Sequence, residues 1–212
     1  MSHRDFRRGK AIAFTLFYLV LLYLVITIIG MLSLKSQSDP ISDPWFTLME
    51  IMIIIIAPLL VMLMAEIHYY ASDDVKALSM SALIFMGIMA CITCSIHYLI
   101  LFVSRPIAAM TGLPWLSYIF SFKWPSVIYA LDILAWDLFF ALSMLFAAPV
   151  FKGDRLKSWV RILMIVSGVL SLIGLLGPVL GNMQVRNIGI VGYAVALPVI
   201  CLLLARVFKK AE

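Results

Sequence analysis

Several ionisable side chains lie inside long apolar stretches of this sequence: Glu50, Glu66, His97, Asp132 and Asp137. A carboxylate in the middle of a membrane helix costs roughly 2.5–3.5 kcal/mol, so it usually faces the protein interior, pairs with another group or carries a proton. Glu66 lies close to the inner end of its stretch, where it can reach lipid headgroups. The other four residues therefore form the candidate site.

The spacing of these residues places three of them at one depth. At 1.5 Å per helical residue, Glu50, His97 and Asp132 come out about 10–11 Å to the outer side of the membrane midplane, and Asp137 lies close to the midplane. We expect a buried protonatable site, open toward the outside, that binds a proton, a cation or a small polar molecule. The alternative is a set of interhelical hydrogen bonds that fix the packing, worth about 0.6–2 kcal/mol each.

Asp132 and Asp137 are five residues apart, which on an α-helix separates their side chains by about 140°. We expect that they do not face one narrow point, but that both can border a cavity with Trp136 between them. Trp136 therefore joins the candidate site.

A second pattern, Cys91-x-x-Cys94-x-x-His97, places soft and imidazole ligands on one helical face. Such ligands can hold a transition metal. Zinc sites normally place the two cysteines on a turn, however, and cysteine is a common small residue at helix contacts. We expect packing residues here and no metal or cofactor. The chain has three cysteines, an odd number, so no disulfide framework is implied.

The composition identifies the environment of these residues. Of the 212 residues, 64% are hydrophobic and only 13% are charged, and the mean hydropathy is +1.10. A soluble domain is about half apolar and about a quarter charged. This excess of apolar surface excludes an ordinary soluble fold, and disorder would need low hydrophobicity. The sequence therefore predicts an integral membrane protein.

Long apolar runs that can each cross a ~30 Å hydrocarbon core predict an all-α fold: a polytopic six-helix bundle that forms a single membrane domain over residues 1–212. Barrel strands would instead alternate in polarity. The first run is too long for a cleavable signal peptide, so we expect it to be retained. The expected helices are 11–34, 46–70, 77–104, 127–151, 158–181 and 187–206.

Lysine and arginine predict the orientation of the bundle. Twelve of the sixteen fall on one side, and the other side holds Lys35, Arg105, Lys123 and Arg186. Because cytoplasmic loops carry the excess of positive charge, both termini are expected in the cytoplasm, in a plasma or inner membrane. The net charge of +5 then reflects topology and anionic headgroups, and gives no support for nucleic-acid binding.

The longest connection, 105–126, is then external, and it is rich in aromatic residues. Aromatic side chains of this density favour the headgroup level. The segment is expected either to lie over the outer mouth of the bundle or to anchor the following helix. Its aromatic residues are Trp115, Tyr118, Phe120, Phe122 and Trp124.

Small residues recur at intervals of three or four in the last two apolar runs, as at Ser171, Gly174, Gly189 and Gly192. This spacing permits close backbone approach. We expect these two helices to pack tightly together, and the same face could support a homo-oligomer.

Three functions fit these features, and none of the common catalytic motifs, such as a P-loop or H-E-x-x-H, is present. The leading hypothesis is a transporter or channel that handles a cation or a proton-coupled small solute. The second is an intramembrane enzyme that uses Glu50, His97, Asp132 and Asp137 for acid–base chemistry on a lipid or isoprenoid. The third is a non-catalytic membrane subunit or sensor. A water-filled cavity at the Glu50 level favours the first, a lateral cleft the second, and a closed, fully paired layer the third.

Overall fold

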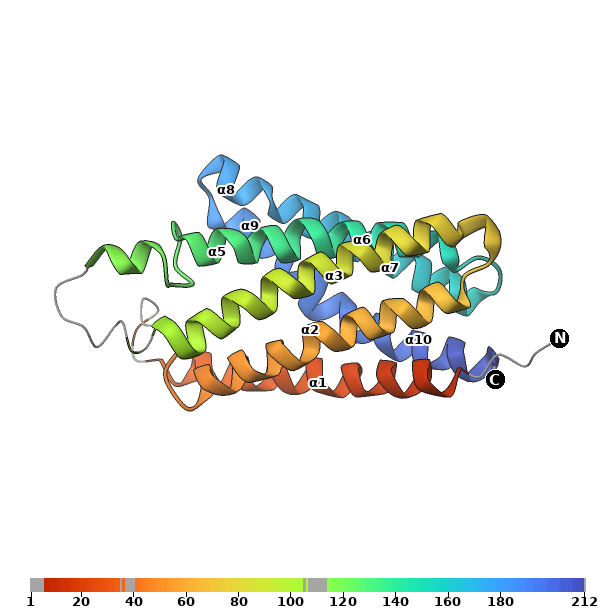
Figure 1. Ribbon diagram of the computed structural model, residues 1–212, viewed down its shortest axis with the longest axis horizontal. Coiled ribbons are helices and arrows are strands. Elements are labelled where there is room, and N and C mark those ends of the chain that lie inside the picture. The colour runs from red at the N-terminus through yellow and green to blue at the C-terminus, as the bar shows by residue number, and fades with distance from the viewer. Residues whose placement is uncertain (1–5, 35, 37–40, 105, 107–113, 212) are drawn as a thin grey trace.

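The computed structural model describes residues 6–34, 36, 41–104, 106 and 114–211, and within them the chain is all-α. The expectation of six long apolar helices is confirmed: each is long and apolar enough to cross a membrane. These membrane spans are Arg7–Leu32, Trp45–Tyr70, Asp73–Ser104, Val127–Val150, Arg155–Leu180 and Met183–Ala211 (Figure 1).

The first three spans are α1 (Arg7–Leu32), α2 (Trp45–Tyr70) and α3 (Lys76–Tyr98). The short 3₁₀-helix η1 (Asp73–Val75) precedes α3, and the π-helix η2 (Leu99–Ser104) continues it. A 3₁₀-helix, η3 (Pro114–Tyr118), lies in the connection to the fourth span.

The last three spans are built from several segments each. The fourth comprises α5 (Val127–Ile133), the π-helix η4 (Leu134–Phe140), α6 (Ala141–Ala147) and η5 (Ala148–Val150). The fifth comprises α7 (Arg155–Gly174) and α8 (Leu176–Leu180). The sixth comprises α9 (Met183–Ile190), the π-helix η6 (Val191–Ala196) and α10 (Leu197–Ala211).

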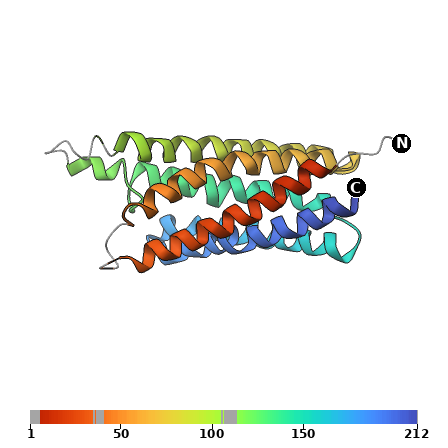
Figure 2. The same cartoon turned by 90° about the horizontal axis from the view of Figure 1, so that it is seen from below.

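The spans form one elongated bundle (Figures 1 and 2). The element α1 packs against α2 and α10, α2 against α3, α3 against η4 and α6, and α7 against α9 and η6. The start of α1 and the end of α10 lie together at one end, which we call the terminus end. The opposite end, near η3 and the start of α5, we call the loop end.

Local capping residues determine where the site-bearing helices begin. The Ser126 side chain accepts a hydrogen bond from the backbone N–H of Tyr129 at the start of α5. Asn182 does the same for Gln184 at the start of α9. Between α8 and α9, Gly181 adopts φ 65°, a left-handed conformation that glycine tolerates and that commonly ends a helix. The sixth span therefore begins earlier than expected, and it includes Arg186, which the sequence placed in a connection.

Tight packing of the last two spans is confirmed. A Cβ added at Gly174 would lie 3.0 Å from the Cα atom of Gly189, and one added at Gly192 would lie 2.6 Å from the backbone oxygen of Ser167. Only residues without a Cβ allow the backbones to approach this closely. The crossing of α7 with α9 and η6 therefore depends on these glycines.

The aromatic connection is described only in part, since residues 105 and 107–113 lie outside the described residues. Trp115 and Tyr118 in η3 are mostly exposed. Phe122 turns inward, and its ring lies 5.2 Å from the imidazole ring of His97, between ring centres. The end of this connection thus covers the histidine at the loop end.

Candidate functional site

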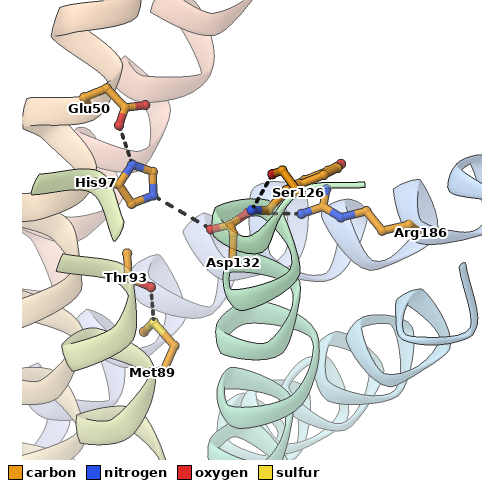
Figure 3. Close-up of polar contacts among 8 residues, drawn as sticks. Glu50, Met89, Thr93, His97, Ser126, Asp132 and Arg186 are labelled. Atoms are coloured by element: carbon orange, nitrogen blue, oxygen red, sulfur yellow. Dashed lines mark hydrogen bonds and ion pairs between the residues drawn. The ribbon is translucent and has the colours of Figure 1, made fainter. Parts of the chain in front are cut away.

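A hydrogen bond joins α2 and α3 inside the bundle near the loop end. The Nδ1 atom of His97 lies 2.8 Å from the Oε2 atom of Glu50 (Figure 3). Both side chains are buried, with 8% and 5% of their surface exposed. Removal from water makes a hydrogen bond to a carboxylate strong, and makes an unpaired carboxylate costly.

The other ring nitrogen of His97 faces a second carboxylate. Its Nε2 atom lies 3.8 Å from the Oδ1 atom of Asp132 on α5, a separation typical of an ion pair. The imidazole thus stands between two carboxyl groups, in contact with one and near the other (Figure 3). The structure brings together the three residues that the sequence placed at one depth.

Arg186 extends this arrangement, and sequence reasoning missed it. Its Nη2 atom lies 3.4 Å from the Oδ2 atom of Asp132, and its Nε atom lies 3.8 Å from the Oδ2 atom of Asp137. Only 6% of its side chain is exposed. The guanidinium carbon lies 5.2 Å and 6.0 Å from the ring centres of Tyr129 and Tyr193, respectively.

A signal for Arg186 was present in the sequence. The polar stretch around residue 186 resembled a loop by composition, but Asn182 before it is a favoured N-cap residue. A helix that begins there carries Arg186 into the membrane one turn later. Two aspartates on the neighbouring fourth span also required a cation, because buried carboxylates seldom remain unpaired.

Asp132 and Asp137 both approach the guanidinium of Arg186, through different nitrogens, so they come closer to one another than a separation of 140° on an α-helix suggests. The reason is the π-helix η4, which begins directly after α5 and contains Asp137. A π-helix bonds residue i to residue i+5 and therefore places more residues in each turn than an α-helix does. Side chains five apart then come closer to one face. Trp136 is buried beside them, with its ring packed against those of Tyr193 and Phe140.

Asp137 occupies a narrow slot between two glycines. Its side chain is fully buried, and Cβ atoms added at Gly174 and Gly189 would lie 2.9 Å and 2.5 Å from its carboxyl oxygens. Among the described residues, neither oxygen has a hydrogen-bond partner, and the same holds for the Oγ atom of Ser171 and the Nε atom of Arg186. A buried polar atom without a partner costs about 1–3 kcal/mol, and more when it is charged.

We call Glu50, His97, Asp132, Asp137 and Arg186 the buried polar network. Three carboxyl groups face one guanidinium and one imidazole, so when all three are ionised negative charge exceeds positive charge even with His97 protonated. Excess charge in a low-dielectric interior is expensive. The network can become neutral by taking up protons, and His97 can transfer them because each of its nitrogens faces a carboxylate.

The cysteine pattern does not converge on one point. Cys91 is exposed on the surface of α3, whereas His97 is buried. The Sγ atom of Cys94 contacts the backbone oxygen of Ile54 at 3.8 Å. In the part of the chain that the structure describes, no group of three or more His, Cys, Asp or Glu side chains could hold a metal ion.

Glu66 and His68 lie apart from the network, near the terminus end. The Oε1 atom of Glu66 lies 3.7 Å from the Nε atom of Arg8. The Nδ1 atom of His68 lies 2.8 Å from the hydroxyl oxygen of Ser79. Lys76 donates hydrogen bonds to the backbone oxygens of His68 and Ala71 at the end of α2.

Comparison with known proteins finds no family model, no curated protein and no solved structure that matches this chain. The fold and composition define a six-helix, multi-pass membrane protein. Its function therefore has to be argued from the chemistry of the buried polar network.

Proposed function

We propose that the protein is a small proton-coupled transporter that takes up protons at the buried polar network and uses them to move a small solute. The observation that carries this proposal is the excess of buried carboxylates over buried cations in Glu50, His97, Asp132, Asp137 and Arg186. A membrane interior tolerates such an excess only when protons or cations neutralise it.

The order of contacts supports a path for protons. His97 lies between Glu50 and Asp132, and Arg186 lies between Asp132 and Asp137. A proton on His97 makes an imidazolium that competes with Arg186 for Asp132, and a proton passed on to Asp132 removes the charge that holds Arg186. The guanidinium can then shift toward Asp137, whose carboxyl oxygens have no hydrogen-bond partner among the described residues. Proton uptake and a movement of the sixth span are thereby coupled.

A purely structural role accounts less well for this arrangement. A network that served only to fix helix packing would satisfy its members, whereas neither carboxyl oxygen of Asp137 has a hydrogen-bond partner among the described residues. The network also draws on four spans, and three of them contain a π-helix near it: η2, η4 and η6. Irregular turns of this kind occur frequently at functional sites.

We further propose that the chain forms a single membrane domain in a plasma or inner membrane, with both termini cytoplasmic. The support is the distribution of lysine and arginine, of which twelve fall on one side by sequence and eleven of those twelve are described residues toward the terminus end of the bundle. Three residues of that tally, Arg4, Lys35 and Arg105, lie outside the described residues. The loop end, and with it the network, would then face the outside.

Charge displacement after a pH jump tests the main proposal without knowledge of the solute. Proteoliposomes adsorbed on a solid-supported membrane produce a transient current when protons bind at a site partway across the bilayer. We expect this current for the native protein. Asn keeps the shape of Asp but cannot ionise, so Asp132→Asn and Asp137→Asn should each reduce the transient at least several-fold.

The matched control is Glu66→Gln, which removes a carboxylate at the terminus end, near the headgroup level. It should keep most of the signal. Equal transients in the native protein and both Asn variants would refute proton uptake by the network. In that case Asp137→Leu should only lower the thermal unfolding midpoint, as expected for a structural layer.

Sidedness is tested separately with an impermeant thiol reagent on intact cells. We expect labelling of Ser121→Cys, in the connection at the loop end, and no labelling of Asp73→Cys at the terminus end until the membrane is opened. The reverse pattern would overturn the proposed orientation.

A further inference from the structure

A cavity of about 370 Å³ opens at the terminus end, far from the buried polar network. It lies where three spans end or begin: at the ends of α2 and η5 and at the start of α7. Phe6, which directly precedes α1, lies beside it. Small-molecule sites commonly occupy about 300–1,000 Å³. The lining residues are Phe6, Tyr70, Ser72, Pro149, Val150, Lys152 and Lys157.

One side of the cavity is cationic. It includes Lys152 and Lys157, and the ammonium group of Lys157 lies 5.5 Å from the ring centre of Tyr70. A second cavity, of about 280 Å³, shares Tyr70 and Lys157 with the first and adds Lys210. Three lysines therefore line the two cavities, and Asp154 also lines the second.

Two carboxylates nearby lie within ion-pair distance of two of these lysines, Lys152 and Lys210. Asp154 accepts a hydrogen bond of 3.0 Å from the backbone N–H of Lys157, and its other oxygen lies 3.7 Å from the ammonium of Lys210. Asp74 accepts a hydrogen bond from the hydroxyl of Ser72 and lies 3.6 Å from the ammonium of Lys152. The Asp154 carboxylate is thus anchored to the backbone of α7, and the Lys157 ammonium remains on the wall of the cavity.

The other side is apolar and rigid. The ring of Tyr70 lies 5.4 Å from that of Phe6, and 6.0 Å from each of the rings of Phe151 and Phe208, between centres. Phe6 is 5% exposed and Phe208 is fully buried. An aromatic wall held by so many contacts does not have to be ordered when a ligand binds, which favours affinity.

We propose that this cavity binds a phosphate group, either that of an anionic lipid headgroup or a free phosphate. Ammonium groups and hydroxyls suit phosphate oxygens, and the apolar wall of Phe6, Pro149 and Val150 suits a glycerol and acyl region. The cavity lies where the spans end, which is the depth of the headgroups. Basic pockets between membrane helices are known to hold anionic headgroups.

Thermal unfolding of the full chain in a neutral detergent tests the proposal. The midpoint is followed while phosphatidylglycerol, phosphatidylcholine or inorganic phosphate is added. Phosphatidylglycerol should raise the midpoint at lower concentration than phosphatidylcholine. Each lysine near an anionic lipid contributes about fivefold in affinity, so the double variant K152Q/K157Q should require about 25-fold more phosphatidylglycerol.

The control is K209Q, which removes an exposed lysine that lines neither cavity and should leave the titration unchanged. Protection by phosphatidylglycerol alone assigns the site to a lipid headgroup, and equal, lysine-dependent protection by inorganic phosphate assigns it to free phosphate. The proposal is overturned if the two lipids act alike, if none of the three compounds raises the midpoint, or if K209Q shifts the titration as much as K152Q/K157Q.

Discussion

The two ends of the bundle use the same ionisable residue types under different physical conditions. At the terminus end, three carboxylates lie near cations that reach solvent: Arg8 beside Glu66 is 84% exposed, Lys210 beside Asp154 is 66% exposed, and Lys152 beside Asp74 is 58% exposed, although the side chain of Glu66 itself is only 11% exposed. In the buried polar network, Arg186 is 6% exposed. Water and headgroups therefore screen the cations of the first set, whereas members of the second set must compensate one another.

This difference shows that two ion pairs with similar distances can contribute different amounts to the free energy of unfolding. The distance from Arg8 to Glu66 is 3.7 Å, and that from Arg186 to Asp137 is 3.8 Å. Exposed pairs contribute about 0–1 kcal/mol. Removing one member of a buried pair costs about 3–5 kcal/mol, because the remaining charge has no replacement for water. Paired substitutions at the two ends can test this contrast.

The largest effect is expected at Arg186. Replacing it by Met leaves Asp132 and Asp137 without their shared cation and should lower the free energy of unfolding by about 3–5 kcal/mol. Arg8→Met should lower it by less than about 1 kcal/mol. Denaturant unfolding in detergent measures both. Adding Asp137→Asn to the Arg186→Met variant should recover part of the loss, and equal losses for the two arginines would contradict the contrast.

The next effect concerns the two histidines. His97 bonds a buried carboxylate, so His97→Gln should cost about 1.5–3 kcal/mol. His68 bonds the neutral hydroxyl of Ser79, so His68→Gln should cost about 0.5–1.5 kcal/mol. The same unfolding measurement ranks them. A larger loss for His68 would show that the terminus end is the more tightly coupled region.

A glycine substitution probes the slot around Asp137. In Gly189→Ala the new Cβ lies 2.5 Å from a carboxyl oxygen of Asp137, and the overpacking should cost about 1–3 kcal/mol. The control Gly87→Ala, on α3, meets no atom within 4 Å and should be neutral or stabilise by up to about 1 kcal/mol. Removing the carboxyl group in Gly189→Ala/Asp137→Ala should reverse part of the loss. If Gly189→Ala is as harmless as Gly87→Ala, the slot is not rigid.

The smallest effect is expected at Asp154, outside the spans. Hydrogen bonding to the backbone N–H of Lys157, aided by the charge of Lys210, lowers the pKa of this carboxyl below its ordinary value of 3.8. A lowered folded-state pKa adds stability above the unfolded pKa, and this stability is lost as the pH falls through the folded pKa. Asp154→Asn keeps the capping oxygen without the charge. The thermal midpoints of the native protein and this variant should therefore differ at neutral pH and converge in acid; a constant difference would refute the charge effect.

The common depth of Glu50, His97 and Asp132 could be predicted because it follows from one number, the rise per residue of a helix. Arg186 could not be placed in the same way. The polarity of its neighbours resembled that of a loop, and its favourable environment is created by aspartates about fifty residues earlier in the chain. A residue whose position is stabilised mainly by distant partners gives only a weak local signal.

The cavity at the terminus end also could not be predicted from the sequence. Its walls come from the start of α1, the end of α2, the end of η5 and the start of α7, which are separated along the chain. Each lysine by itself suggested only the usual positive charge of a cytoplasmic loop. Their assembly around one aromatic wall depends on how the spans are packed.

The sequence by itself determined the membrane class, the six spans and the shared level of Glu50, His97 and Asp132 along the bundle. Hydrophobicity in a contiguous window and helical rise are local properties, which need no knowledge of neighbouring helices. Only the tertiary structure decided which ionisable groups meet. A π-helix in the fourth span turns Asp132 and Asp137 toward the same arginine, and the glycine crossing of α7 and α9 brings that arginine within reach. Both features depend on contacts between spans, because the energy of an irregular turn or a buried charge is set by what lies opposite it.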